Sequence, residues 1–329
     1  MNQMIGVWIV SLKNFSTNNF SFIFETMSKV DIKLFITLIC LTFLGNSIYG
    51  NFESLANQTI SLKGLIWIAG GLIFSFISII INAYAWKLLL DSIGCNSNNL
   101  NIIKVFLNTN IYKYLPGGVW HFVSRYNILR LEISNQKSVE SILLEPLLML
   151  VAGLIFVPFG SLNIYLFVLC WLSTLVFLKG FREFIIKRLI AMKSKIFNIK
   201  KLNDNNIVQN SHDIPKKICY PYKALFAEIV FILFRFFGFY CCMTAFDIGA
   251  LISQRSLISS FSFAWIIGLI IPAAPGGLGV FESVILFSLA SHLPEAPLLA
   301  ALLSYRLVST LSDVFAALVY PAKRLLKLS

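Results

Sequence analysis

Six long apolar runs dominate the pattern of hydrophobic and polar positions along the chain. Each run has about the length that a helix rising about 1.5 Å per residue needs to cross about 30 Å of hydrocarbon. The runs lie at residues 33–51, 65–87, 141–160, 162–180, 223–246 and 298–320. The pattern therefore predicts an all-α polytopic membrane protein with about six full spans.

Two further apolar segments, at about 102–130 and 257–292, are interrupted by one repeated motif of the form P-G-G-x-x-x-F-x-S. The motif residues are Pro116, Gly117 and Gly118 in the first copy and Pro275, Gly276 and Gly277 in the second. Proline removes a backbone donor and glycine adds backbone freedom, so each copy should break a helix. Because the stretch after each break is short for a full crossing, two broken, re-entrant hairpins are expected. The alternative is that the motifs mark two ordinary loops.

The order of these segments predicts an inverted repeat. The span at 65–87, the first hairpin and the span at 141–160 correspond to 223–246, the second hairpin and 298–320. Discontinuous helices in inverted halves commonly surround a transport site near the middle of the bilayer. The expected organisation is a single membrane domain, 1–329. It comprises an interfacial segment (1–30), a first half (31–180), a basic amphipathic helix with a linker (181–222) and a second half (223–329).

The distribution of basic residues predicts the orientation. From Lys179 to Lys223 the chain carries eleven Lys or Arg residues but three acids, so this segment should be cytoplasmic. Both termini are then cytoplasmic, and the expected location is the plasma (inner) membrane. The net charge of +12 follows this topology, so no nucleic-acid partner is inferred.

Composition narrows the function classes. The chain is 57% hydrophobic and 13% charged, well outside the range of soluble domains. Its six cysteines show no C-x-x-C spacing, and no phosphate loop, nucleotide fingerprint or zinc pattern is present. No catalytic residue, metal or cofactor is therefore predicted, and the chain is expected to be a transporter rather than an enzyme.

Two arginines should lie near the bilayer midplane, Arg235 and Arg306. Each has an acid seven residues away on the same helix face, Glu228 and Asp313 respectively. An arginine at this depth costs roughly 2.5 to 3.5 kcal/mol, so both should face protein or water. Either the four residues cross-pair as a buried ion-pair lattice, or a guanidinium grips a phosphate in bidentate fashion.

Further charges surround the first motif and follow the second. Lys113, His121, Arg125 and Arg130 predict a cationic cluster at the inner mouth, although the two arginines also suit ordinary positive-inside anchors. Glu145 and Glu282 are acids at membrane depth. They are candidates for counter-ions or proton carriers, or for structural pairing.

The sequences PAAPGGLGVFES at 272–283 and YLPGGVWHFVSRY at 114–126 resemble the membrane region of the lysylphosphatidylglycerol synthases. In the second copy the resemblance covers Pro272, Pro275, Gly276, Gly277, Gly279 and Glu282. It implies a lipid flippase that moves an aminoacylated phospholipid between leaflets, here as a stand-alone member without the soluble synthase domain.

The leading hypothesis is a translocase for a phosphate-containing lipid head group. Arg125, Arg235 and Arg306 are the candidates for phosphate contact, and Glu282 for a cationic substituent or a proton. Glu145 and Asp313 complete the substrate-binding set together with the motif residues. The partners implied are anionic or aminoacylated phospholipids, or a polyprenyl phosphate or polyprenyl-linked sugar, with a soluble synthase or glycosyltransferase nearby. Other readings are an intramembrane lipid-modifying transferase and a non-transporting membrane partner of a soluble enzyme.

Overall fold

The computed structural model describes residues 48–56, 60–95, 101–115, 119–161, 163–178, 220–271 and 279–319, with a few isolated positions besides. Every regular element in this part of the chain is helical. The long helices are α4 (Leu62–Ser92), α7 (Asn135–Leu154), α10 (Tyr222–Ala245) and α13 (Glu295–Val319). The expectation of an all-α membrane protein is confirmed.

Four of the described helices are long and apolar enough to cross a membrane, and they largely coincide with four of the six expected spans. The second of them joins α7 to the short helix η3 (Val157–Gly160). The apolar run at 162–180 forms a shorter helical segment than expected. It begins as α8 (Ile164–Leu172) and continues as the 3₁₀ helix η4 (Ser173–Phe177). The run at 33–51 lies mostly outside the described residues and precedes α3 (Phe52–Ala56).

In each interrupted segment, a pair of helices flanks the motif. The first pair is α5 (Ile102–Asn110), extended by η2 (Ile111–Tyr114), and α6 (Trp120–Leu129); the second is α11 (Gln254–Ile270) and α12 (Val280–Leu289). The six motif residues themselves, Pro116, Gly117, Gly118, Pro275, Gly276 and Gly277, lie outside the described residues. The interfacial segment at 1–30 and nearly all of 181–222 lie outside them as well.

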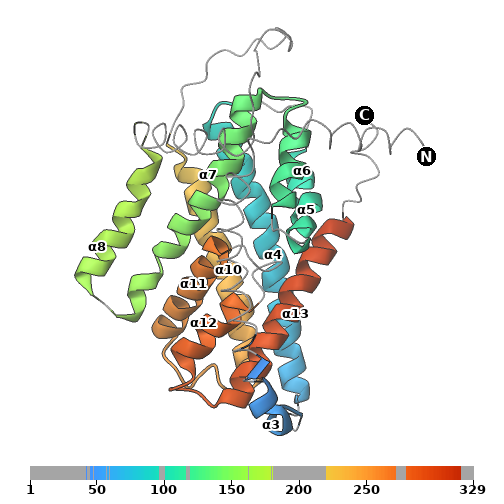
Figure 1. Ribbon diagram of the computed structural model, residues 1–329, viewed down its shortest axis with the longest axis vertical. Coiled ribbons are helices and arrows are strands. Elements are labelled where there is room, and N and C mark those ends of the chain that lie inside the picture. Colours follow the sequence, from blue (N-terminus) through green and yellow to red (C-terminus); the bar gives the residue numbers. More distant parts are fainter. Residues whose placement is uncertain are drawn as a thin grey trace, which may run out of the picture.

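The two pairs occupy opposite ends of the molecule (Figure 1). The α5–α6 pair lies toward the upper end, where α4 ends and α7 begins, whereas the α11–α12 pair lies toward the lower end, where α10 ends and α13 begins. Helices α4 and α13 run upward in this view, and α7 and α10 run downward. Each pair therefore returns to the end from which it enters.

Helices α4 and α10 approach closely because small residues line their contact. A Cβ atom on Gly238 would lie 2.5 Å from Ser75 Oγ, and one on Gly71 would lie 3.0 Å from the Gly238 carbonyl oxygen. At the nearby end of the interface, a Cβ on Gly64 would lie 2.8 Å from the Ala245 carbonyl oxygen. Small residues give apolar helices dispersion contact between backbones, which drives helix association where water is absent. This antiparallel pair is the central axis of the fold.

Four aromatic rings hold the second pair against the long helices. Phe261 on α11 lies 5.4 Å from Phe239 on α10 and 5.7 Å from Phe281 on α12, measured between ring centroids. Phe281 in turn lies 5.6 Å from Tyr305 on α13. Aromatic rings at these separations attract one another beyond their simple burial. The cluster fixes one wall of the cavity that lies between the two pairs.

Large apolar side chains cover the outside of the bundle. Phe287 on α12 is 88% exposed and Leu307 on α13 is 65% exposed. Ile66 and Ile73 on α4 are also largely exposed. Lipid chains solvate such side chains without cost, whereas water would not. The exterior is therefore suited to hydrocarbon, and the polar groups are gathered inside.

Candidate functional site

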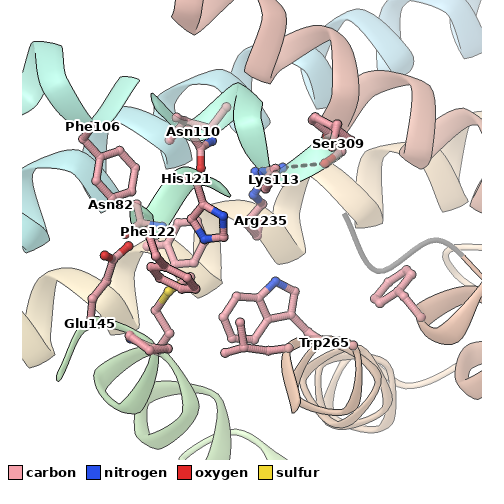
Figure 2. A pocket seen from close by; sticks show the side chains of 18 of the residues that line it. Asn82, Phe106, Asn110, Lys113, His121, Phe122, Glu145, Arg235, Trp265 and Ser309 are labelled. Carbon is pink, nitrogen blue, oxygen red and sulfur yellow. Dashed lines mark hydrogen bonds between the residues drawn. The ribbon is translucent and has the colours of Figure 1, made fainter. Parts of the chain in front are cut away.

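A cavity of about 310 Å³ lies where the two helix pairs face each other. The first pair contributes Lys113, His121 and Arg125, and the second contributes Trp265 and Phe281. Figure 2 shows Lys113 and Ser309 toward one end, Glu145 toward the other and His121 between them. The long helices α4, α7, α10 and α13 close the sides.

Arg125 forms the most enclosed ion pair at this cavity. Its Nη1 donates to both carboxylate oxygens of Glu145 on α7, at 2.5 and 2.6 Å, and its Nε donates to Thr109 Oγ1 at 3.1 Å. The guanidinium carbon lies 3.8 Å from the ring centre of Phe106 and 5.2 Å from that of Trp86. Stacking and charge-assisted hydrogen bonds together fix the guanidinium plane. The pair ties α6 to α4, α5 and α7.

Asp313 on α13 is the hub of a second cluster. Its carboxylate is fully buried and accepts hydrogen bonds from Asn110 Nδ2 at 2.8 Å and from Tyr114 Oη at 2.6 Å. Lys113 Nζ lies 2.7 Å from the same carboxylate, and Arg235 Nη2 lies 3.7 Å from it. One carboxylate thus contacts two cationic side chains from different halves of the chain. The cluster joins the first helix pair to α10 and α13.

The remaining arginine, Arg306, pairs with the second helix pair. Its Nε donates to Glu282 Oε1 at 2.7 Å, while Glu282 Oε2 accepts the backbone N–H of Gly279 at 2.8 Å. Gly279, the N-cap of α12, has a φ of 84°, a left-handed conformation that glycine adopts without strain. On the neighbouring α10, Arg235 Nη1 donates to Ser309 Oγ at 2.8 Å. Glu282 therefore closes the helix end and holds the guanidinium at once.

The cationic side chains of the cavity wall outnumber the carboxylates that contact them. In the described part of the chain, the cations that line it are Lys113, Arg125, Arg235 and Arg306. The carboxylates in contact with these four are Glu145, Asp313 and Glu282. In an apolar region this surplus attracts an anion strongly, because little water screens it.

The structure brings together all six charged residues predicted for the site, but it changes their pairing. Of the expected cross-pairs, Arg235 meets Asp313, whereas Arg306 meets Glu282 rather than Glu228. The sequence sets which face of a helix a residue shares, but the rotation of each helix against its neighbours decides the partner.

The predicted cationic cluster at the inner mouth is wrong in part. Arg125 on α6 is buried, whereas Arg130, which directly follows α6, is exposed, because five residues along a helix turn the side chain to a different face. Lys113 and His121 line the cavity between the two helix pairs.

The sequence analysis did not predict two polar contacts of the site, those of Asn110 and Tyr114 with Asp313. The run NTNIYKY at 108–114 held a signal, since Asn110, Lys113 and Tyr114 share a face at helical spacing. Across the described residues, no group of three or more His, Cys, Asp or Glu side chains is arranged to hold a metal ion.

Comparison with known proteins identifies one match. A family model described as the lysylphosphatidylglycerol synthase TM region matches residues 30–317, which is most of the chain. A search of curated proteins finds no match. The matched range includes both helix pairs and every residue of the cavity wall.

Proposed function

Because the chain belongs to the lysylphosphatidylglycerol synthase transmembrane region family, we propose that it moves a phosphate-containing lipid head group between the leaflets of a membrane. The head group passes through the cavity between the two helix pairs while the acyl chains stay in the bilayer. No covalent chemistry is required of the protein. The protein is then a transporter of the flippase type, acting in the plasma membrane.

The observation that carries this proposal is the surplus of cations around the cavity between the two helix pairs. A charged head group that enters bare hydrocarbon loses its water without compensation, at a prohibitive cost. Arg235 and Arg306 offer planar donors that suit the oxygens of a phosphate, and Lys113 adds a point charge. These groups replace the lost water, which lowers the barrier to crossing.

The arrangement of the helix pairs supports alternating access. Since α5–α6 and α11–α12 lie at opposite ends of the molecule, small movements of one pair at a time would open the cavity to one leaflet. We interpret the two halves as an inverted repeat in which α4, α5–α6 and α7 correspond to α10, α11–α12 and α13. The basic segment at 181–222 then faces the cytoplasm, and so do both termini.

All the candidate lipids carry a phosphate group. A cationic substituent, such as an aminoacyl group, would find the carboxylate of Glu282, which lies next to Arg306. A polyprenyl phosphate lacks such a substituent and would use the cations alone. A soluble synthase or glycosyltransferase would supply the lipid on the cytoplasmic side.

Reconstitution tests the proposal directly. The protein is placed in liposomes with fluorescent phosphatidylglycerol, and dithionite reports how much label stays in the inner leaflet. Arg306→Gln should lower the initial rate by about tenfold or more, as expected when an arginine that contacts a charged group is lost at roughly 1.5 to 3 kcal/mol. Leu307→Ala, which changes the next residue on the lipid-facing side of α13, is the matched control.

The outcomes separate the alternatives. Equal rates for the wild type, Arg306→Gln and empty liposomes would reject translocation. A second series with lysyl-phosphatidylglycerol and a polyprenyl phosphate assigns the substrate, because Glu282→Gln should slow only the aminoacylated lipid. Unchanged Leu307→Ala rates show that the effect of Arg306→Gln is not a general loss of packing.

A further inference from the structure

The two ends of the cavity differ in charge. At one end Lys113 and Arg235 share the carboxylate of Asp313, so positive charge is in excess there. At the other end Arg125 and Glu145 balance each other, because one guanidinium nitrogen donates to both carboxylate oxygens. We call these the phosphate end and the Arg125 end. An anion is drawn to the phosphate end, which leaves the Arg125 end for a different part of the head group.

The Arg125 end gathers side chains from three helices. Asn82 on α4 lies one helical turn before Trp86, whose ring centre is 5.2 Å from the guanidinium carbon of Arg125. His121 lies one turn before Arg125 on α6. Figure 2 shows Asn82 on the side of the cavity where Glu145 of α7 lies. Asn82, His121 and Glu145 all line the cavity.

Two polar atoms at this end lack a partner. Asn82 is 6% exposed, and neither its Oδ1 nor the ring nitrogen Nδ1 of His121 has a hydrogen-bond partner among the described residues. The terminal bond of either side chain can turn by half a circle at little cost, so either of its polar atoms can face the cavity. Buried polar atoms are nearly always hydrogen-bonded, because an unpaired one has lost its water without compensation. The two side chains are therefore suited to bind a ligand in the cavity.

The surroundings of these atoms exclude several classes of ligand. An ammonium or choline group would lie near the guanidinium of Arg125, and both oxygens of Glu145 are already bonded to that guanidinium. A second phosphate would have to displace Glu145. An alkyl group would leave Asn82 and His121 unpaired. A hydroxyl group both donates and accepts, so it can pair with either polar atom of each side chain and adds no charge.

We propose that the Arg125 end binds the hydroxyl groups of an uncharged polyol, a glycerol or a sugar, which the transported lipid carries next to its phosphate. Asn82 and His121 bind the hydroxyls, and the rings of Phe106 and Phe122 line the same cavity. The volume of about 310 Å³ is close to the lower limit of about 300 Å³ for small-molecule pockets, enough for a phosphate with one small polyol. This inference rests on the proposed translocation, because it assigns a second part of the same head group.

Lipid competition tests the polyol subsite without reference to transport. Nanodiscs hold the full chain with equal amounts of phosphatidylglycerol, phosphatidylinositol and phosphatidylpropanol, and native mass spectrometry gives the ratio of the lipids that stay bound. All three lipids carry one negative charge, but phosphatidylpropanol has no free hydroxyl group on its head. The wild type should retain a hydroxylated lipid about tenfold over phosphatidylpropanol, as expected for the loss of one or two hydrogen bonds. Preference for phosphatidylglycerol identifies the polyol as a glycerol, and preference for phosphatidylinositol identifies it as a sugar-like ring.

Four variants assign the preference to residues. Asn82→Leu should bring the ratio close to unity, because leucine keeps the branched shape but forms no hydrogen bond, and His121→Phe should lower the ratio too. Ser75→Ala is the matched control and should leave the ratio unchanged, since it removes another unpartnered buried oxygen from α4 that does not line the cavity. Arg306→Gln should weaken the retention of all three lipids alike, because each carries the same phosphate. Unfolding in SDS verifies that each variant is folded, and if Asn82→Leu does not fold, His121→Phe decides.

The outcomes separate this subsite from translocation. A wild-type ratio near unity, or a ratio that neither Asn82→Leu nor His121→Phe lowers, would overturn the polyol subsite, and the dithionite assay would still decide translocation. A ratio that Ser75→Ala lowers as much as Asn82→Leu would also overturn it, because the effect would then come from the packing of α4. A high ratio in a protein that moves no lipid would leave the subsite standing and reject translocation.

Discussion

Removing the buried carboxylate of Asp313, which contacts two cations of the cavity wall, should destabilise the protein strongly. Lys113 Nζ and Arg235 Nη2 lie 2.7 and 3.7 Å from this carboxylate. With an effective dielectric constant of about 20, these distances correspond to attractions of about 6 and about 4.5 kcal/mol before desolvation is subtracted. Since both charges stay in place when Asp313→Ala removes their partner, the net loss should be about 3 to 5 kcal/mol.

Reversible unfolding in mixed lipid and SDS micelles measures this loss. Leu311→Ala, on the lipid-facing side of the same helix, is the control and should cost much less. Adding Lys113→Met to Asp313→Ala should recover part of the stability, because one unpaired charge is removed with its partner. If Asp313→Ala loses no more than Leu311→Ala, or if Lys113→Met deepens the loss, the idea that one carboxylate neutralises two cations is refuted.

Two further predictions concern the fold and the orientation. Gly238→Val should cost about 1 to 3 kcal/mol in the same unfolding assay, because its side chain would collide with Ser75 at 2.5 Å, whereas Gly70→Ala, with 3.9 Å to its nearest neighbour, should be tolerated. Equal losses would contradict the close contact of α4 and α10. In a background without other reactive thiols, Ser134→Cys before α7 should react with an impermeant maleimide only from the cytoplasmic side, and Ser253→Cys before α11 only from outside. Labelling of both from one side would refute the opposite entry of the two helix pairs.

Much of the architecture follows from local pattern alone. Long apolar runs must be helical in lipid, because every backbone donor and acceptor then has a partner within its own segment. The same reasoning predicted helix breaks at the two motifs, and helices do flank both of them. The sequence also required Arg235 and Arg306 to face the interior, and both line the cavity.

The local sequence pattern predicted the ends of helices and the short apolar runs less well. The segment at 162–180 has the composition of a span, yet it divides into α8 and η4. Ser173 Oγ and Thr174 Oγ1 donate to the carbonyl oxygens of Cys170 and Trp171, and the chain tightens at this point. Such back-bonding of hydroxyls bends or tightens helices, and hydropathy does not register it.

The partners of the charged residues were decided only by the tertiary structure. The sequence offered Glu228 and Glu282 alike as partners for Arg306, and nothing linked Asn110 to Asp313, which lies 203 residues away. The periodicity of a helix defines which residues share a face, but the rotation and crossing of neighbouring helices define what that face meets. The sequence by itself therefore determined that charges must be buried between helices. Only the packing decided which cations the buried acids Glu145, Asp313 and Glu282 contact.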